Sequence, residues 1–171
     1  MEAIPFAQSV FRRMLDPDLR GFSGSLDEFR EHSADFSRWL GGLQEEALDH
    51  AYAPGKWTAR EVLGHVVDTH VILSFRILSF GRGEIQPLPG ADEGLWTRLS
   101  GHSWLPKSEL IRGYRSAAGL SAWITETLPQ AALERSGVAN GVLLTVRELI
   151  AYLPAHERHH RRILRELYGI G

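Results

Sequence analysis

The C-terminal quarter of the chain carries the pattern that most restricts the fold. Apolar residues recur at helical spacing after Thr145, at Val146, Leu149, Ile150, Leu153, Ile163, Leu164 and Leu167. This spacing predicts one long amphipathic helix, which must bury its apolar face against other elements. Thr145 and Glu148 spell a capping box at its start. Pro154 lies inside the helix and removes the hydrogen bond to Ile150, so a kink is expected there.

Three further stretches show the same spacing and predict long helices over residues 25–40, 58–80 and 106–128. Capping boxes mark the first two starts, Ser25 with Glu28 and Thr58 with Glu61. Gly41-Gly42 is expected to end the first helix, because glycine readily adopts the left-handed conformation of a C-cap. The side chains expected to pack inward from these helices are Leu26, Phe29, Phe36, Trp39, Leu40, Val62, Val66, Thr69, Ile72, Leu73, Phe80, Leu110, Ile111, Tyr114, Leu120, Trp123 and Ile124.

Two shorter helices are predicted over residues 4–15 and 92–99. No stretch alternates apolar and polar residues beside a hairpin turn, so no strand is predicted. Four long helices in 171 residues predict an all-α fold, a four-helix bundle with antiparallel or crossover connections. The length indicates a single domain over residues 1–171, in which residues 1–24 form an N-terminal extension that carries the short helix.

Composition and charge argue against several classes of function. A net charge of −2 offers no electrostatic reason to bind nucleic acid or a membrane surface. No uninterrupted apolar run approaches a transmembrane length, and the charged N-terminus lacks the apolar core of a signal peptide. We therefore expect a cytoplasmic protein with no nucleic-acid or membrane partner. The chain has no cysteine, so a metal site must use histidine, carboxylate or water.

Three of the eight histidines fall in one segment of five residues, His156–His160. At about 100° per residue, the middle of the apolar stripe passes through His160 and close to His156, whereas His159 lies on the flank. Two imidazoles on a buried face need partners, because an unpaired buried polar group is costly. His65, near the inward face of the second long helix, is the best third ligand. Three neutral imidazoles with an open fourth position are typical of a catalytic zinc site, and imidazole also suits nickel, iron and copper.

A solvated, basic helix end is the alternative interpretation, because arginines at 158, 161, 162 and 165 surround the cluster. His70 falls off the stripe of its own helix and is expected at the surface or at an interface. Asp68 either accepts a hydrogen bond from the site or is a solvated carboxylate. Arg76 either lines a pocket or extends its charged end to solvent. The histidines without a partner pattern are expected at the surface: His32, His50 and His102.

The same segment also spells H-E-x-x-H, the motif of zincin metalloproteases, in which Glu157 would be the general base. The longer form of that motif requires glycine at 163 and histidine at 166, where this chain has Ile163 and Glu166. No edge strand for a peptide substrate is predicted. The context therefore disfavours a protease.

Three motifs together resemble the DinB-like (DinB/YfiT) superfamily: YAPGKWTAREVLGHVVD at Tyr52–Asp68, PLPGADE at Pro87–Glu93, and the segment His156–His160. The match covers most of the chain from about Ser25 onward. The resemblance implies an up-down-down-up four-helix bundle, often a homodimer. It also implies a divalent metal ion, commonly nickel or zinc, held by three histidines, which in this chain are His65, His156 and His160. Two positions depart from the relatives: His70 stands where many carry an acidic residue, and Pro154 where a helix-permissive residue is usual.

The resemblance implies metal-dependent chemistry on small molecules. Relatives include S-transferases that use low-molecular-weight thiols such as bacillithiol, mycothiol-dependent isomerases and metal-dependent hydrolases. The leading hypothesis is a metal-dependent enzyme that activates a low-molecular-weight thiol or water against a small electrophilic substrate. The alternatives are a metal-dependent hydrolase and a non-catalytic metal-binding module of a stress response. A fold of this kind indicates the site better than it indicates the reaction.

Overall fold

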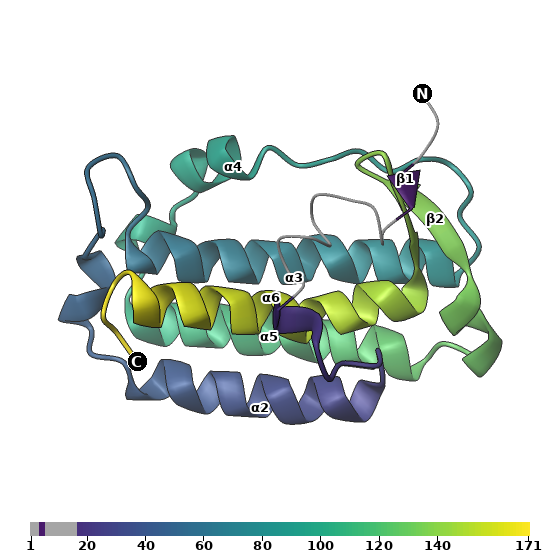
Figure 1. Ribbon diagram of the computed structural model, residues 1–171, viewed down its shortest axis with the longest axis horizontal. Helices are drawn as coiled ribbons and strands as arrows, with labels where there is room; N and C mark the ends of the chain where they lie inside the picture. The colour runs from purple at the N-terminus through teal and green to yellow at the C-terminus, as the bar shows by residue number, and fades with distance from the viewer. Residues whose placement is uncertain (1–3, 6–16) are drawn as a thin grey trace.

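The structure is a computed structural model that describes residues 4–5 and 17–171. Its body is a bundle of four long helices: α2 (Leu26–Gly42), α3 (Ala59–Gly81), α5 (Lys107–Glu126) and α6 (Val146–Glu166). Helices α3 and α5 run in one direction and α2 and α6 in the other, which is the up-down-down-up order (Figure 1). The predicted all-α four-helix bundle is therefore confirmed.

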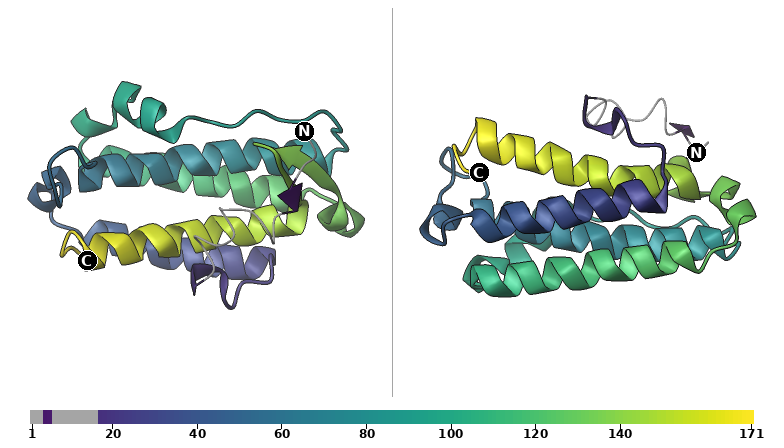
Figure 2. Two further views of the ribbon diagram at one scale, coloured as in Figure 1. Left: turned by 45° about the horizontal axis from the view of Figure 1, so that its top comes forward. Right: turned by 90° about the horizontal axis from the view of Figure 1, so that it is seen from below.

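A long crossover joins the parallel helices α3 and α5. It passes along the outside of α3 and contains α4 (Glu93–Leu99) and the 3₁₀ helix η3 (His102–Trp104) (Figures 1 and 2). Asp92 caps α4 by accepting a hydrogen bond from the backbone of Leu95 at 2.9 Å, so the short helix predicted at 92–99 is confirmed. Two more 3₁₀ helices lie in the other connections, η2 (Glu46–Asp49) before α3 and η4 (Gln130–Glu134) after α5.

A small sheet at one end of the bundle contradicts the expectation of no strands. Strands β2 (Ser136–Ala139) and β3 (Val142–Thr145) form an antiparallel hairpin, in register with Val138 opposite Leu143. Strand β1 (Ile4–Pro5) pairs with β3 in parallel and completes the order β1-β3-β2. The helix predicted over 4–15 is therefore wrong at its first two residues, and residues 6–15 lie outside the described part of the chain.

The hairpin turn explains why these strands form. The turn residues Asn140 and Gly141 have φ angles of 53° and 73°. A two-residue hairpin turn with both central residues at positive φ is the one that an Asn-Gly pair favours, because it matches the twist of the flanking strands. The sequence signal was therefore present at this turn, in a stretch predicted only as a connection.

Capping boxes start two of the long helices as predicted. Thr58 accepts a hydrogen bond from the backbone of Glu61, and the Glu61 carboxylate accepts one from the backbone of Thr58. Thr145 and Glu148 make the same reciprocal pair at the start of α6. Helix α6 then continues through Pro154 to Glu166, and the kink expected at this proline stays a prediction.

Helix α2 differs from expectation at both ends. Ser25 accepts a hydrogen bond from the backbone of Glu28, but the Glu28 carboxylate accepts from the backbone and hydroxyl of Ser23, at 2.8 and 2.9 Å, instead of reaching back to Ser25. Only half of the capping box forms. The helix extends through Gly42 and closes at Leu43, whose backbone is extended (φ −67°, ψ 146°). No left-handed glycine cap forms there.

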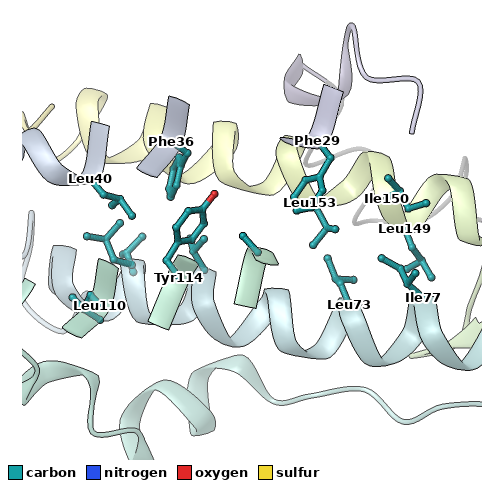
Figure 3. Packing of buried hydrophobic residues seen from close by; sticks show 14 of the residues in the cluster. Phe29, Phe36, Leu40, Leu73, Ile77, Leu110, Tyr114, Leu149, Ile150 and Leu153 are labelled. Atoms are coloured by element: carbon teal, nitrogen blue, oxygen red, sulfur yellow. The ribbon is translucent and has the colours of Figure 1, made fainter. Parts of the chain in front are cut away.

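The core lies between the four long helices, where side chains from each helix pack together (Figure 3). Burying one large apolar side chain contributes about 1.5–3 kcal/mol, so this interior holds the helices in place. Three side chains that were predicted to point inward or to lie on the apolar stripe are instead exposed: Leu120, Trp123 and Leu167. Small side chains form the inward face of α5 in their region: Ala117, Ala118 and Ser121.

Helix α3 is long and apolar enough to cross a membrane, judged by length and composition alone. This differs from the sequence-based expectation, which considered only uninterrupted apolar runs. It is the one such helix in the described part of the chain, with a mean hydropathy of 1.3. Half of that window is buried inside the bundle. The apolar composition of α3 therefore fits its place as a core helix that packs against α5 and α6.

Candidate metal centre

Three histidine side chains meet between α3 and α6. His156 and His160 lie one turn apart on α6, and His65 faces them from α3. The Nε2 atom of His156 is 3.2 Å from that of His65 and 3.0 Å from that of His160. These are the residues predicted as metal ligands. Among the described residues, they form the one group of potential ligands whose ligand atoms all lie within 4.8 Å of one another.

The spacing of the three nitrogens fits a metal ion. Metal–nitrogen bonds of about 2.0–2.1 Å separate neighbouring ligand nitrogens by about 2.9–3.4 Å, depending on the coordination angle. The two short Nε2 separations lie within that range. When each ring carries its proton on Nδ1, the three Nε2 atoms keep their lone pairs free for a metal ion, as ligation requires.

Burial keeps these imidazoles neutral. It lowers the pKa of His65 to about 4, with smaller contributions from His159 and His102. Burial, followed by the neighbouring imidazoles, lowers the pKa of His156 and of His160 well below the ordinary range. Neutral imidazole is the form that binds a metal ion, so the three side chains are in the binding form at neutral pH.

Aromatic side chains flank the triad, and a pocket opens beside it. The ring of Trp57 lies 5.3 Å from that of His65, and the ring of Tyr152 stacks on His156 at 5.8 Å with an interplanar angle of 22°. A pocket of about 380 Å³ is lined by His160 together with Trp57 and Tyr168. A small molecule can therefore approach the triad from the side of His160.

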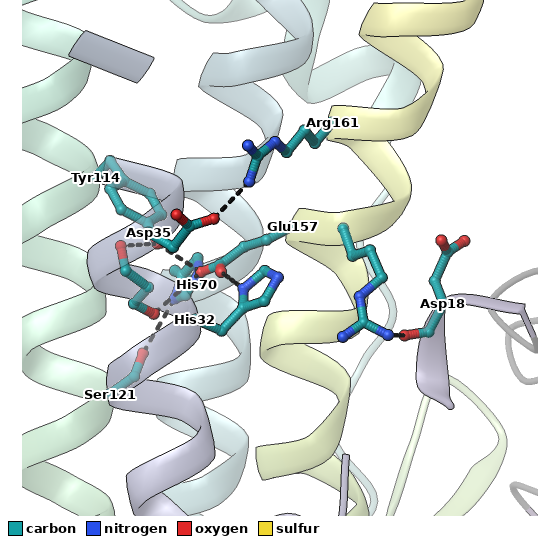
Figure 4. A network of polar contacts seen from close by, with 10 residues as sticks. Asp18, His32, Asp35, His70, Tyr114, Ser121, Glu157 and Arg161 are labelled. Carbon is teal, nitrogen blue, oxygen red and sulfur yellow. Dashed lines mark hydrogen bonds and ion pairs between the residues drawn. The ribbon is translucent and has the colours of Figure 1, made fainter. Parts of the chain in front are cut away.

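A second polar cluster surrounds Glu157, the residue after His156, in the bundle core (Figure 4). The Glu157 carboxylate is fully buried and accepts hydrogen bonds from His32 Nδ1, His70 Nε2 and Tyr114 Oη, each at 2.7 Å. Burial by itself raises the pKa of Glu157, but the hydrogen bonds from His32 and His70 outweigh it and the net pKa is lowered. The donors belong to α2, α3 and α5, so one carboxylate on α6 connects all four long helices.

This cluster was not predicted from the sequence. His70, expected at the surface or an interface, is 1% exposed, and the His32 side chain is largely buried rather than on the surface. A signal was available, because Glu157 lies seven residues after Ile150 and seven before Leu164, both of them buried. Seven residues are two helical turns, so all three fall on one face.

The buried stripe of α6 is thus centred on Glu157 rather than on His160, which is half-buried on its flank. The Glu157 carboxylate faces its partners in the core and not the triad. It is therefore not placed as the general base of an H-E-x-x-H metalloprotease, which must act at the metal. The geometry agrees with the sequence-based argument against a protease.

Basic residues around the triad are held in specific contacts. Arg161 pairs with Asp35 at 2.6 Å (Figure 4), and Arg162 pairs with Asp18 at 2.9 Å. His159, expected on the flank, is 8% exposed, and its Nδ1 lies 3.1 Å from the Asp18 carboxylate. A freely solvated helix end is therefore the wrong description of this segment.

Asp68 faces His102 rather than the triad, with its carboxylate 3.6 Å from His102 Nε2. Burial raises the pKa of Asp68, although His102 opposes the shift. The His102 ring packs over Gly64, where an added Cβ would lie 2.2 Å from the ring. This glycine, directly before His65, makes room for the ring. His102 is therefore half-buried rather than on the surface, whereas His50 is exposed as predicted.

Solved structures with low sequence identity share this fold. YfiT from Bacillus subtilis, described as a probable metal-dependent hydrolase with an unusual four-helix bundle topology, gives a TM-score of 0.72 at 20% identity, over 94% of this chain and 89% of that chain. A mycothiol-dependent maleylpyruvate isomerase gives a TM-score of 0.63 at 15% identity, over 90% of this chain and 60% of that chain. The present chain thus spans less than two thirds of the isomerase. No curated protein matches it.

The amino-acid sequence identifies the family directly. The DinB superfamily matches residues 28–164. That range includes His65, His156 and His160 and nearly the whole of the four long helices. The resemblance seen in three sequence motifs is thereby confirmed, and the chain belongs to the DinB superfamily.

Proposed function

We propose that this protein is a metal-dependent enzyme in which His65, His156 and His160 hold one divalent ion, nickel or zinc. The observation that carries the proposal is the convergence of three neutral Nε2 atoms at separations of 3.0 and 3.2 Å between neighbours. Three histidine ligands leave at least one coordination position for water or a substrate, which is the arrangement of catalytic rather than structural zinc sites.

A bound divalent ion would lower the pKa of a water or thiol that enters its open position, which makes a nucleophile at neutral pH. The chain's own residues supply the rest of the site. Burial keeps the ligands neutral, and Trp57 and Tyr152 restrict the orientation of two of the rings. The pocket beside His160 admits the small molecule. Any thiol must come from outside, because the chain has no cysteine.

Two reactions fit this site, and each is supported by a solved structure that shares the fold. Transfer of a low-molecular-weight thiol to a small electrophile is supported by the shared fold of the mycothiol-dependent isomerase. Hydrolysis is supported by the shared fold of YfiT, a probable metal-dependent hydrolase. We favour the thiol-transfer reaction and keep hydrolysis as the second candidate. We also propose that the protein forms a homodimer.

Metal analysis tests the site. Untagged protein purified without chelator is expected to contain about one nickel or zinc ion per chain, as expected for a single three-histidine site. The variants His65→Ala and His160→Ala should lose it. His50→Ala is the matched control, because His50 is exposed and should leave the metal content unchanged. A wild-type protein that stays metal-free after reconstitution would contradict the proposal.

Cobalt substitution separates the candidate reactions. If a thiol is the nucleophile, adding a low-molecular-weight thiol should change the visible spectrum of the cobalt protein, and turnover of an electrophile should require that thiol. If water is the nucleophile, ester or amide hydrolysis should require the metal and no thiol. A metal-loaded protein that is inactive in every such assay would favour a non-catalytic metal-binding module.

A further inference from the structure

A pocket of about 330 Å³ lies between α3 and the crossover that follows it. Its walls are mainly apolar, with Val71 and Phe75 from α3 and Leu88 and Trp96 from the crossover. Val71, Phe75 and Trp96 are 52, 57 and 47% exposed, so this apolar surface faces solvent. The volume falls in the range of about 300–1,000 Å³ that small-molecule sites occupy.

Arg76 joins this pocket to a smaller cavity of about 50 Å³ beneath the hairpin. Its side chain is half-buried, and Nη2 donates one hydrogen bond to the backbone oxygen of Pro89 at 3.3 Å. Burial lowers the pKa of Arg76, although Tyr152 and Glu93 oppose the shift. Glu93 lines the smaller cavity but makes no ion pair with this guanidinium.

Among the described residues, no carboxylate lies within 4.0 Å of the Arg76 guanidinium, and its anionic neighbour Glu93 acts on it only from a longer distance. Arg60, by contrast, is a buried arginine whose charge is paired with carboxylates. Its buried guanidinium donates to Asp49 and to Glu45, both at 2.8 Å. Partly burying a cation without a close ion pair is costly, and Arg76 uses only one of its five N–H donors in a hydrogen bond to the described residues, so an anion in direct contact would stabilise it.

We propose that this pocket binds a small organic acid, with its carboxylate on Arg76 and its apolar body between Phe75 and Trp96. The planar guanidinium presents a fork of donors that matches a carboxylate, and such charge-assisted pairs are stronger than neutral hydrogen bonds. The apolar walls favour an acid with an aromatic or aliphatic body over a small hydrophilic anion.

This site is distinct from the histidine triad and does not depend on it. None of its lining residues is a member of the triad. The two sites are close, because Asp68 on the pocket wall lies one turn beyond His65 on α3. A ligand held by Arg76 would therefore lie beside the proposed metal centre while being held by different groups.

Calorimetric titration with phenylbutyrate and with its uncharged amide, phenylbutyramide, tests the proposal. The wild-type protein should bind the acid at least about tenfold more tightly than the amide, because the acid makes the charge-assisted pair. Arg76→Gln should remove this preference, and Arg76→Lys should keep part of it. Arg98→Gln, which changes an exposed arginine on nearby α4, should leave the preference intact. Trp96→Ala should weaken the binding of the acid and the binding of the amide to a similar extent.

Equal binding of acid and amide, no binding of the acid at millimolar concentration, or an unchanged preference in Arg76→Gln would each overturn the proposal. Circular dichroism of each variant establishes that it is folded. Loss of acid binding in His160→Ala but not in Arg76→Gln would place the carboxylate on the metal, and would also overturn it. Because binding is measured in metal-free protein as well, a failure here is distinct from a failure of the proposed enzymatic function.

Discussion

Glu157 holds one carboxylate at the point where all four long helices approach one another. Its oxygen atoms accept hydrogen bonds from His32 on α2, His70 on α3 and Tyr114 on α5. Because Glu157 directly follows His156 on α6, these bonds also fix the rotation of α6 about its axis. The same rotation decides whether His156 and His160 face His65.

Replacing the Glu157 carboxylate should lower the stability of the fold. Glu157→Gln places an amide NH₂ donor against groups that are themselves donors, and it removes the negative charge. We expect the free energy of unfolding to fall by about 3 kcal/mol, the cost of breaking a buried charged hydrogen-bonded group. Chemical denaturation measures it. Glu126→Gln is the control, because its pair with Arg30 is largely exposed and should change stability by less than about 1 kcal/mol. An equal effect of the two variants would refute the role given to Glu157.

The three histidines of the triad were predictable because their signal is periodic. His156 and His160 are four residues apart on a strongly amphipathic helix, and His65 borders the inward stripe of another. Glu157 and His70 were missed because the stripe was centred on apolar residues alone. A polar residue that is satisfied inside a core looks, by hydrophobicity, like a break in the pattern.

At the scale of elements, the β2–β3 hairpin depends on its turn. Gly141 has a φ of 73°, a conformation that costs a residue with a side chain about 1–2 kcal/mol. Gly141→Ala should therefore lower the free energy of unfolding by about 1 kcal/mol. Gly101→Ala is the matched control, since Gly101 has a φ of −85° and open space at its Cβ position. Thermal unfolding of both variants measures the difference, and equal stability of the two would contradict the role of the turn.

The segment around Asp18 is attached to α6 by charge. Asp18 is 2% exposed and accepts hydrogen bonds from Arg162 and His159. Burial raises the pKa of Asp18, but these bonds outweigh it, so the net pKa is lowered. A carboxylate whose pKa is lower in the folded state stabilises the fold above its unfolded pKa of about 4, and this contribution disappears as the pH falls through the folded value.

Asp18→Asn should consequently be less stable than the wild type at pH 7, by about 1–2 kcal/mol, as for loss of a buried charged hydrogen bond. The gap should narrow as the pH is lowered below about 4, where the wild-type carboxylate also becomes protonated. Denaturation curves at a series of pH values measure the gap. A gap that stays constant over this range would show that the charge of Asp18 does not matter.

Local signals explain which elements were predictable. The capping boxes at Thr58 and Thr145 depend on neighbours three residues apart, so sequence alone reveals them. The capping box predicted at Ser25 forms only in half, because Ser23, which lies outside the motif, donates to the Glu28 carboxylate instead. Strands β2 and β3 were missed because each is only four residues long, and their pairing is visible only when the Asn140-Gly141 turn is recognised first.

At the scale of the whole molecule, residue patterns left the order of the helices open between antiparallel and crossover arrangements. The up-down-down-up order came from the family resemblance, and the structure shows the crossover along α3 that it requires (Figure 1). The order matters for function, because it places α6 beside α3. His65 and His156 are thereby brought together across a sequence separation of 91 residues.

A site built from such distant residues exists only in the folded chain, so metal binding must stabilise the whole molecule. At an ion concentration of 100 times the dissociation constant, the gain is about 2.7 kcal/mol, which raises the melting temperature of a domain of this size by about 5–10 °C. Nickel or zinc should produce this shift in chelator-treated wild-type protein and in His50→Ala. His65→Ala should show no shift, although its α6 still carries His156 and His160. A shift of equal size in His65→Ala would mean that the ion binds to the pair on α6 alone, and that α3 contributes no ligand.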